Sequence, residues 1–332
     1  MSSLDETKLV ENEGGLKQAP SFFLFKWTQS IGLGDVVFRN LTAFFAFLVL
    51  VLAMLTVAAL WINSGPCIKA MGWHFLSSSD WDPIQNIFGA VPFVYGTLVS
   101  SAIALLIAAP LGLGISLFLT ELAPMRFRDP VAFLVETLAA IPSVVYGLWG
   151  MFVLAPIMRV YVDPFLHGFI GGPLFGEGPT GLSLFTAGTI LSIMILPTIT
   201  AISREVFEAV PNVYRESARA LGATSWETIQ LSVLKASKAG IVGAMMLGLG
   251  RALGETMAVT MVIGNTPKVD INLLAPGHSM ASVIANEFTE ATGDVYLAAL
   301  SEIGLLLMGI TLVLNIVAHL LVWATTRNFG KV

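Results

Sequence analysis

The sequence predicts an all-helical integral membrane protein with six transmembrane helices and both termini on the same side. Hydrophobic residues make up 55% of the 332 positions and charged residues only 12%, against about 25% charged in soluble domains. A soluble core could not bury so much apolar surface. Six windows are long enough to cross a hydrocarbon layer about 30 Å thick, which takes about 20 apolar residues in a helix. They are 41–61, 95–119, 131–156, 182–202, 239–264 and 297–323.

Lys and Arg are distributed unevenly between the two sides of these windows. Thirteen lie on the side that holds both termini, and three, Lys69, Arg159 and Lys268, lie on the other. The positive-inside rule therefore places the termini and the loop 203–238 in the cytoplasm. The first apolar run starts near residue 41 after a polar, acidic lead, which does not fit a cleavable signal peptide.

Residues 1–40 are predicted to form a cytoplasmic tail ahead of the six-span domain, 41–326. The first part, to about residue 19, is acidic and poor in large apolar side chains, which is typical of disorder. From Phe22 to Arg39 the pattern becomes amphipathic. Two interpretations stay open for that part: a helix lying at the cytoplasmic interface, and an ordinary extension of the first span.

The loop 203–238 is predicted to contain two short helices that meet at a glycine. Pro211 can begin the first helix, 212–221, and Gly222 can end it in a left-handed conformation. Thr224 and Glu227 have the spacing of a capping box, which would begin the second helix. The small residues of the first helix would let another protein approach its backbone. From the residues alone, a docking element and a solvated connector are equally compatible with this pattern.

Four ionisable residues lie inside the predicted spans: Glu136, Arg251, Glu255 and Glu302. A charge at mid-bilayer costs about 2.5–3.5 kcal/mol, so positions facing lipid are disfavoured. Glu302 is expected to be a protonated acid satisfied by a neighbouring helix. Near Glu136 and Pro142, the hydroxyls of Ser143 and Tyr146 are candidate donors on the same span.

Arg251 and Glu255 are four residues apart, so they would share one helix face and pair. One interpretation is a structural ion pair that fixes helix packing. The other is an oxyanion gate, because Arg251 is the only cation within the spans and its planar fork suits bidentate contact with phosphate oxygens. We expect an exchange in which the guanidinium leaves Glu255 for the anion and then returns.

Several motifs limit the class of protein. Gly250 and Gly254 form a GxxxG pattern, which favours close packing of a partner helix. The sequence has no GxxxxGK[ST] loop, so energy from ATP would have to come from a separate subunit. The histidines and the single Cys67 lack the spacing of metal ligands, which predicts no metal site. No basic patch with interleaved aromatic residues points to nucleic acid.

Three stretches carry a family resemblance. Glu216-Ser217-Ala218, followed after three residues by Gly222, resembles the EAA loop in permease subunits of binding-protein-dependent ABC importers, with Ser217 at the middle alanine. Residues 136–147 and 248–259 resemble the permeases of phosphate importers, specifically their C-type subunit. The second half of the EAA pattern departs from the family. Ser232 replaces an apolar residue and Lys235 replaces a proline, which predicts a smoother run into the fifth span.

The resemblance implies the type I ABC importer permease fold in a bacterial inner membrane, and import of inorganic phosphate. It implies that this chain has no enzymatic activity and no cofactor of its own. The implied partners are a second, A-type permease subunit, two ATPase subunits that bind ATP and Mg, and a periplasmic or surface phosphate-binding protein, besides phosphate and membrane lipid. The implied pathway residues are Arg251, Glu255, Glu136, Ser143 and Tyr146, and the implied ATPase-coupling residues are Glu216, Ser217, Ala218 and Gly222.

Other functions stay open from the sequence. A permease for another oxyanion, such as molybdate or sulfate, would share the same Arg251 chemistry. An ATP-independent channel or secondary transporter would have to explain the docking-type loop. A purely structural membrane scaffold would leave Arg251 within a span unexplained.

Overall fold

The structure is a computed structural model that describes residues 33–176 and 180–327. The predictions of a disordered start and of an amphipathic stretch up to residue 32 lie outside the described residues. The chain divides into two units, Met1–Thr56 and Val57–Val332. The described part of the first unit is the beginning of helix α1, Leu33–Met71.

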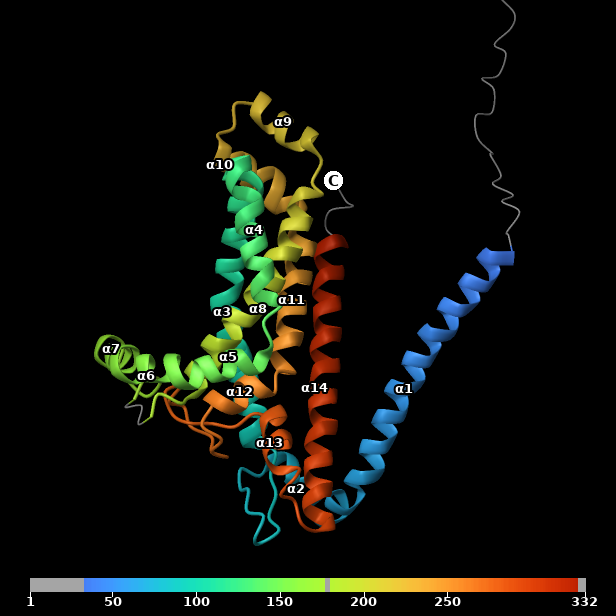
Figure 1. Ribbon diagram of the computed structural model, residues 1–332, viewed down its shortest axis with the longest axis vertical. Helices are drawn as coiled ribbons and strands as arrows, with labels where there is room; N and C mark the ends of the chain where they lie inside the picture. The colour runs from blue at the N-terminus through green and yellow to red at the C-terminus, as the bar shows by residue number, and fades with distance from the viewer. Residues whose placement is uncertain (1–32, 177–179, 328–332) are drawn as a thin grey trace, which may run out of the picture. The chain divides into compact units, whose positions relative to one another are not determined.

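The regular elements of the described residues are helices (Figure 1). Across the described ranges, four short π-helical turns, η1 to η4, interrupt or extend α-helices. In chain order after α1, the elements are α2 His74–Ser77, α3 Val91–Leu117, η1 Phe118–Leu122, α4 Met125–Ala139, α5 Ser143–Trp149, η2 Gly150–Leu154, α6 Ala155–Ile157, η3 Met158–Val162, α7 Asp163–Phe169, α8 Leu184–Glu208, α9 Asn212–Ala220, α10 Ser225–Thr228, η4 Ile229–Leu234, α11 Lys238–Leu253, α12 Met257–Val262, α13 Met280–Glu287 and α14 Asp294–Arg327.

The prediction of an all-helical membrane protein is confirmed by the length and apolarity of these helices. Within the described ranges, five helical stretches are long and apolar enough to cross a membrane, or six if one bent pair counts as a single span. The five are Gly34–Met71, Val91–Leu122, Ser143–Phe169, Leu184–Glu208 and Asp294–Trp323. The bent pair is Ser225–Leu234 with Lys238–Leu253, at 74°.

The third predicted window, 131–156, is two helices rather than one kinked span. Helix α4 ends at Ala139 and α5 begins at Ser143, directly after Pro142. Proline lacks the amide that a helix needs and disfavours helical backbone in the residue before it, here Ile141. The long apolar stretch therefore starts at Ser143, and α4, which carries Glu136, is a separate helix.

The fifth predicted window, 239–264, is also broken. Helix α11 ends at Leu253, Gly254 leaves the helix with φ −92° and ψ 0°, and α12 begins at Met257. Glycine is a poor helix former, which favours a break here. The smoother run predicted at Lys235 is wrong as well, because the helices before and after it meet at 74°. Alone, the 16 residues of α11 span about 24 Å.

Helices α3 and α8 lie side by side in the second unit and form its main core (Figure 1). Two glycines bring them close together. A Cβ added at Gly188 would lie 2.5 Å from Cγ2 of Ile103, and one at Gly112 would lie 3.0 Å from Cγ2 of Ile199. Such small residues let membrane helices approach closely. Helix α11 also packs against α8.

Candidate functional site

The site forms where α5 and η2 pack against α12, and one glycine of each, Gly147 of α5 and Gly150 of η2, sets this approach. A Cβ added at Gly147 would lie 2.6 Å from Sδ of Met261, and one at Gly150 would lie 2.7 Å from Cγ1 of Val262. Beside Gly147, the buried Tyr146 donates a hydrogen bond from its hydroxyl to the carbonyl of Leu138, at 2.8 Å. This bond bridges the break between α4 and α5.

Replacing Gly147 with Val is expected to destabilise the protein, because the added side chain meets α12 with no room to move. Overpacking of this kind costs about 1–3 kcal/mol. The thermal stability of the purified full chain in detergent would show the loss. Gly114→Val in α3 is the matched control, since a Cβ there meets nothing within 4 Å. Equal stability of the two variants would contradict the α5–α12 packing.

Arg251 lies in the last turn of α11, next to this junction. Its Nη1 donates a hydrogen bond of 3.4 Å to Oγ1 of Thr198 in α8. Its charge also interacts with Tyr146. Among the residues that the structure describes, Arg251 forms no ion pair and no other hydrogen bond. The guanidinium is exposed and keeps most of its donors for other partners.

The predicted pair of Arg251 with Glu255 is wrong. Pairing at a spacing of four residues needs a continuous helix, and the helix ends at Leu253. Glu255 lies in the connection to α12, where its Oε1 accepts a hydrogen bond of 3.3 Å from the amide of Ala258. It therefore satisfies one of the free amides at the start of α12. The predicted exchange, in which the guanidinium leaves Glu255 for the anion, therefore has no ion pair from which to start.

Glu136 belongs to a different cluster. Its Oε1 lies 3.7 Å from Nη1 of Arg204, which also pairs with Glu208 at 3.0 Å. Arg204 follows Thr198 by six residues, or about 9 Å along α8. The structure thus brings together Arg251, Thr198 and Tyr146, with Ser143 partly exposed on the same helix as Tyr146. Sequence reasoning missed Thr198, although a hydroxyl within an apolar span is a signal.

Within the described residues, the GxxxG glycines are not in close contact with another helix, although Gly250 lines a small cavity beside Thr311 and Leu314 of α14. A Cβ at Gly250 would meet nothing within 4 Å, and one at Gly254 would meet only the Gly250 carbonyl oxygen, at 3.8 Å. The close contact falls instead on Gly248, where a Cβ would lie 2.9 Å from Cγ1 of Ile199. Close packing of a partner helix on Gly250 and Gly254 stays a prediction.

At the other end of the second unit, near α13, the polar groups are fixed by packing. His278 is buried and its Nδ1 lies 2.7 Å from the hydroxyl of Ser282. Burial lowers the pKa of His278 to about 4, so the ring is neutral at pH 7. Glu287 accepts hydrogen bonds from Nε1 of Trp81, at 2.9 Å, and from the Tyr296 hydroxyl, at 2.6 Å. These contacts give the polar side chains of His278 and Glu287 partners within the chain.

The loop 203–238 folds as the local signals predict. Helix α9 ends at Ala220, and Gly222 follows with φ +86°. The amide of Ala223 donates to the carbonyl of Ala218 at 3.1 Å, which completes a Schellman motif. The capping box of Thr224 and Glu227 is present at the start of α10. The predicted two-helix hairpin is therefore confirmed.

Arg215 anchors this loop to the helices below it, a contact that sequence reasoning missed. Its Nε and Nη2 donate to Oε1 of Glu121 at 3.0 and 2.8 Å, and Nη2 also donates to the carbonyl of Phe207 at 2.8 Å. Ser232, the departure from the EAA pattern, donates to the carbonyl of Tyr214 at 2.9 Å. Both contacts hold α9 in a fixed orientation.

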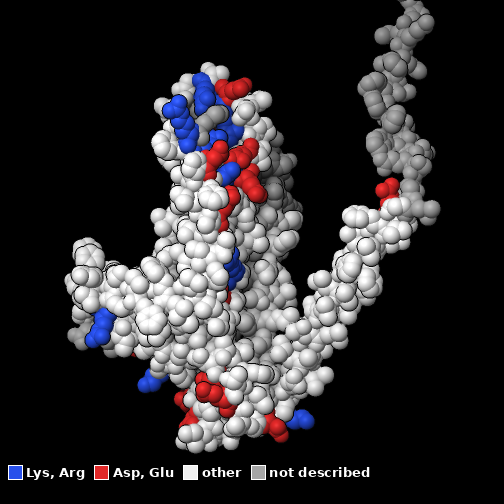
Figure 2. Space-filling view, in the orientation of Figure 1, with Lys and Arg blue, Asp and Glu red and all other residues white. Residues whose placement is uncertain are grey.

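The outer face of the loop exposes apolar side chains among charged ones. We call this set the docking surface: Val213, Tyr214, Leu221 and Trp226, which are 67%, 56%, 90% and 58% exposed. Figure 2 shows Lys and Arg gathered at the α9 end of the second unit, with Asp and Glu beside them. Exposed apolar groups next to charges indicate a surface that binds another protein. Glu216 and Ser217 are exposed on the same helix.

Residues 111–327 match the family described as the binding-protein-dependent transport system inner membrane component, and the chain belongs to this family. The most similar relatives include proteins named "Phosphate transport system permease protein PstC". The one from Mesorhizobium japonicum is 47% identical over 302 residues, covering 89% of this chain and 92% of the relative. The one from Pasteurella multocida is 45% identical over 302 residues, covering 90% and 94%. 

Solved structures share the fold at low sequence identity. A chain of a bacterial alginate ABC transporter aligns with a TM-score of 0.57 at 16% identity, covering 90% of this chain and 98% of that one. A chain of the MetNI methionine ABC transporter aligns with a TM-score of 0.54 at 17% identity, covering 74% and 99%. The chain therefore shares its fold with a chain of each of these two ABC transporters.

Proposed function

We propose that this chain is the permease subunit of an ATP-driven importer of inorganic phosphate. The relatives named as phosphate transport permeases support the substrate. The observation that carries the proposal within the structure is Arg251, a cation beside apolar helices with no acid paired to it among the described residues. Charge-assisted, bidentate hydrogen bonds to phosphate are what such a guanidinium makes best.

The pathway follows from what surrounds Arg251. Thr198 and Tyr146 bring hydroxyl groups near the guanidinium. The Thr198 hydroxyl can donate to a phosphate oxygen beside the guanidinium, whereas the Tyr146 hydroxyl donates to the Leu138 carbonyl. Because Glu255 caps α12 instead of neutralising Arg251, the cation attracts an anion without first leaving a carboxylate. Release then depends on a change in how α11, α12 and α5 lie around Arg251. The break at Gly254 is the hinge that this change would use.

The loop 203–238 and the lack of a GxxxxGK[ST] sequence both suggest which partners the chain needs. The docking surface, with Glu216, Ser217, Ala218 and Gly222 beside it, would seat in an ATPase that binds ATP and Mg. Two ATPases, an A-type permease and a phosphate-binding protein would complete the importer. The α9 end and both termini would then face the cytoplasm of a bacterial cell. The phosphate-binding protein would deliver its substrate at the α13 end, across the inner membrane.

Purification of the full chain with its partners tests this proposal. We expect an ATPase and a second permease to co-purify, and ATP hydrolysis in liposomes to rise when phosphate and the binding protein are added. Molybdate and sulfate serve as competitors, and stronger stimulation by either would assign the importer to another oxyanion. Transport by the isolated chain without ATP would contradict the proposal and favour a channel or secondary transporter.

Replacing Gly222 with Val is expected to reduce the amount of co-purified ATPase several-fold. Only backbone strain is at issue, since a Cβ at this position meets nothing within 4 Å while φ is +86°. Left-handed backbone costs a residue with a side chain about 1–2 kcal/mol, and Asn tolerates it best. Gly222→Asn is therefore the matched control and should retain the ATPase. Equal retention by both variants would show that the turn does not position the docking surface.

A further inference from the structure

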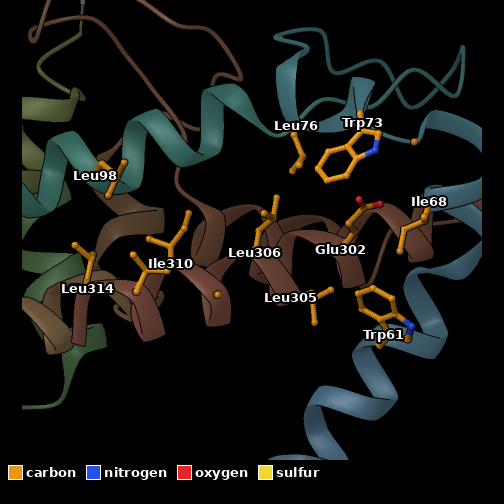
Figure 3. A pocket seen from close by; sticks show the side chains of 13 residues that line it. Trp61, Ile68, Trp73, Leu76, Leu98, Glu302, Leu305, Leu306, Ile310 and Leu314 are labelled. Carbon is orange, nitrogen blue, oxygen red and sulfur yellow. The ribbon is translucent and has the colours of Figure 1, made fainter. Parts of the chain in front are cut away.

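A large apolar cavity lies apart from Arg251, between the end of α1, α2, α3 and α14 (Figure 3). Its volume is about 720 Å³. Trp61 and Ile68 of α1 and Leu98 of α3 line its sides, and Leu306 and Ile310 of α14 line its length. All of these residues belong to the second unit. Nothing in the proposed import pathway uses this cavity.

Glu302 is the one acid in the wall of this cavity, and its side chain is almost fully buried, at 7% exposed. Figure 3 shows its carboxyl between the indoles of Trp61 and Trp73. The Cys67 thiol contacts the carboxyl, but Oε2 has no hydrogen-bond partner. Among the described residues no cation pairs with it. An unpaired carboxylate in such surroundings is strongly disfavoured, so the group is a neutral acid with a hydroxyl to donate.

The walls match one chain of a membrane lipid. From Glu302 to Leu314, thirteen residues of α14 line or flank the cavity, and the twelve steps between the two ends measure about 18 Å, close to one leaflet of a hydrocarbon layer about 30 Å thick. At the near end, Lys69 and Trp73 are exposed. Indole and lysine side chains at that level are typical of the membrane interface.

We propose that this cavity holds one glycerophospholipid from the leaflet next to α2. Its acyl chain lies along α14 between Leu305 and Leu314, an ester carbonyl accepts the hydrogen bond of the Glu302 acid, and its phosphate lies near Lys69. The apolar wall requires an acyl chain, so free phosphate does not satisfy this site. The lipid supplies the acceptor that the carboxyl lacks within the described part of the chain.

The test uses the full chain in its assembled transporter, purified in mild detergent and reconstituted with 16:0/18:1 phosphatidylethanolamine or phosphatidylglycerol. Native mass spectrometry counts retained lipid. Dicyclohexylcarbodiimide, an apolar reagent that attacks protonated carboxyls, reports access to Glu302 by peptide mass spectrometry. We expect one tightly retained lipid per chain and labelling of Glu302 that falls about tenfold when either lipid is added, the scale of a lost hydrogen bond plus displaced contact. Inorganic phosphate alone should give no protection.

Three variants sharpen the result. Glu302→Gln keeps a donor and should retain the lipid, whereas Glu302→Leu removes it and should lose the lipid. Gly309→Phe fills the cavity, since a Cβ at Gly309 meets nothing within 4 Å. This variant should also lose the lipid, while its unfolding temperature stays near that of the parent.

Protection of Glu302 from dicyclohexylcarbodiimide is measured in the unmodified chain, so this result does not depend on whether any variant folds. Equal labelling with and without lipid would overturn the proposal. Loss of lipid in Glu302→Gln, with binding of phosphatidylethanolamine only, would also overturn it, in favour of an ionised carboxylate holding an ammonium headgroup.

Discussion

Replacing Arg251 with Gln is expected to reduce phosphate uptake by about 100-fold, because the pathway loses its cation. Hydrogen bonds to charged groups contribute about 1.5–3 kcal/mol, and each 1.4 kcal/mol is a factor of about ten. Lys at this position keeps the charge but not the fork, so Arg251→Lys should lose less, about tenfold. Uptake of radiolabelled phosphate into cells or liposomes, at equal membrane abundance of each variant, measures the effect.

Glu255→Gln is the informative companion to this variant. If Arg251 exchanged between Glu255 and phosphate, both substitutions would impair transport alike. The structure instead has Glu255 accepting from the Ala258 amide, and an amide oxygen can accept the same bond. We therefore expect a much smaller loss for Glu255→Gln than for Arg251→Gln. Unchanged uptake in Arg251→Gln would refute the role of Arg251 in the pathway.

How far the sequence predicted this structure depends on the range of the interactions involved. The hairpin of α9 and α10 follows from Pro211, Gly222 and the pair Thr224 and Glu227, whose effects act within one turn of backbone. The number and limits of the spans were less predictable. A hydropathy window averages over a break, so it passes through Pro142 and Gly254 without registering either.

Long-range contacts explain the remaining differences at the site. The pairing of Arg251 with Glu255 rests on helical spacing, and it is lost because the helix ends at Leu253, two residues before Glu255. The Glu255 carboxylate accepts from the Ala258 amide instead. Glu136 finds Arg204, and Arg251 finds Thr198. Each is set by packing between helices distant in sequence. A single sequence contains the residues but not the packing that selects one partner among several.

Arg215 shows how much such a long-range contact is worth, and its loss is the second large effect that we expect. Its partner Glu121 is 94 residues away, and the two side chains are only 12% and 8% exposed. Breaking a buried ion pair from one side costs about 3–5 kcal/mol, because the remaining charge is left unpaired. Arg215→Ala should therefore release α9 from η1 and from the end of α8.

The expected readout is loss of coupling rather than loss of phosphate binding. The Arg215→Ala transporter should retain about tenfold less ATPase through purification, and hydrolysis by what remains should no longer respond to phosphate and the binding protein. Arg219→Ala is the matched control, an exposed cation on the same helix, and should change neither. Glu121→Gln, measured alone and with Arg215→Ala, closes a double-mutant cycle. Additive effects would mean that the pair does not act as a unit, and that α9 is held by other contacts such as Ser232 with the Tyr214 carbonyl.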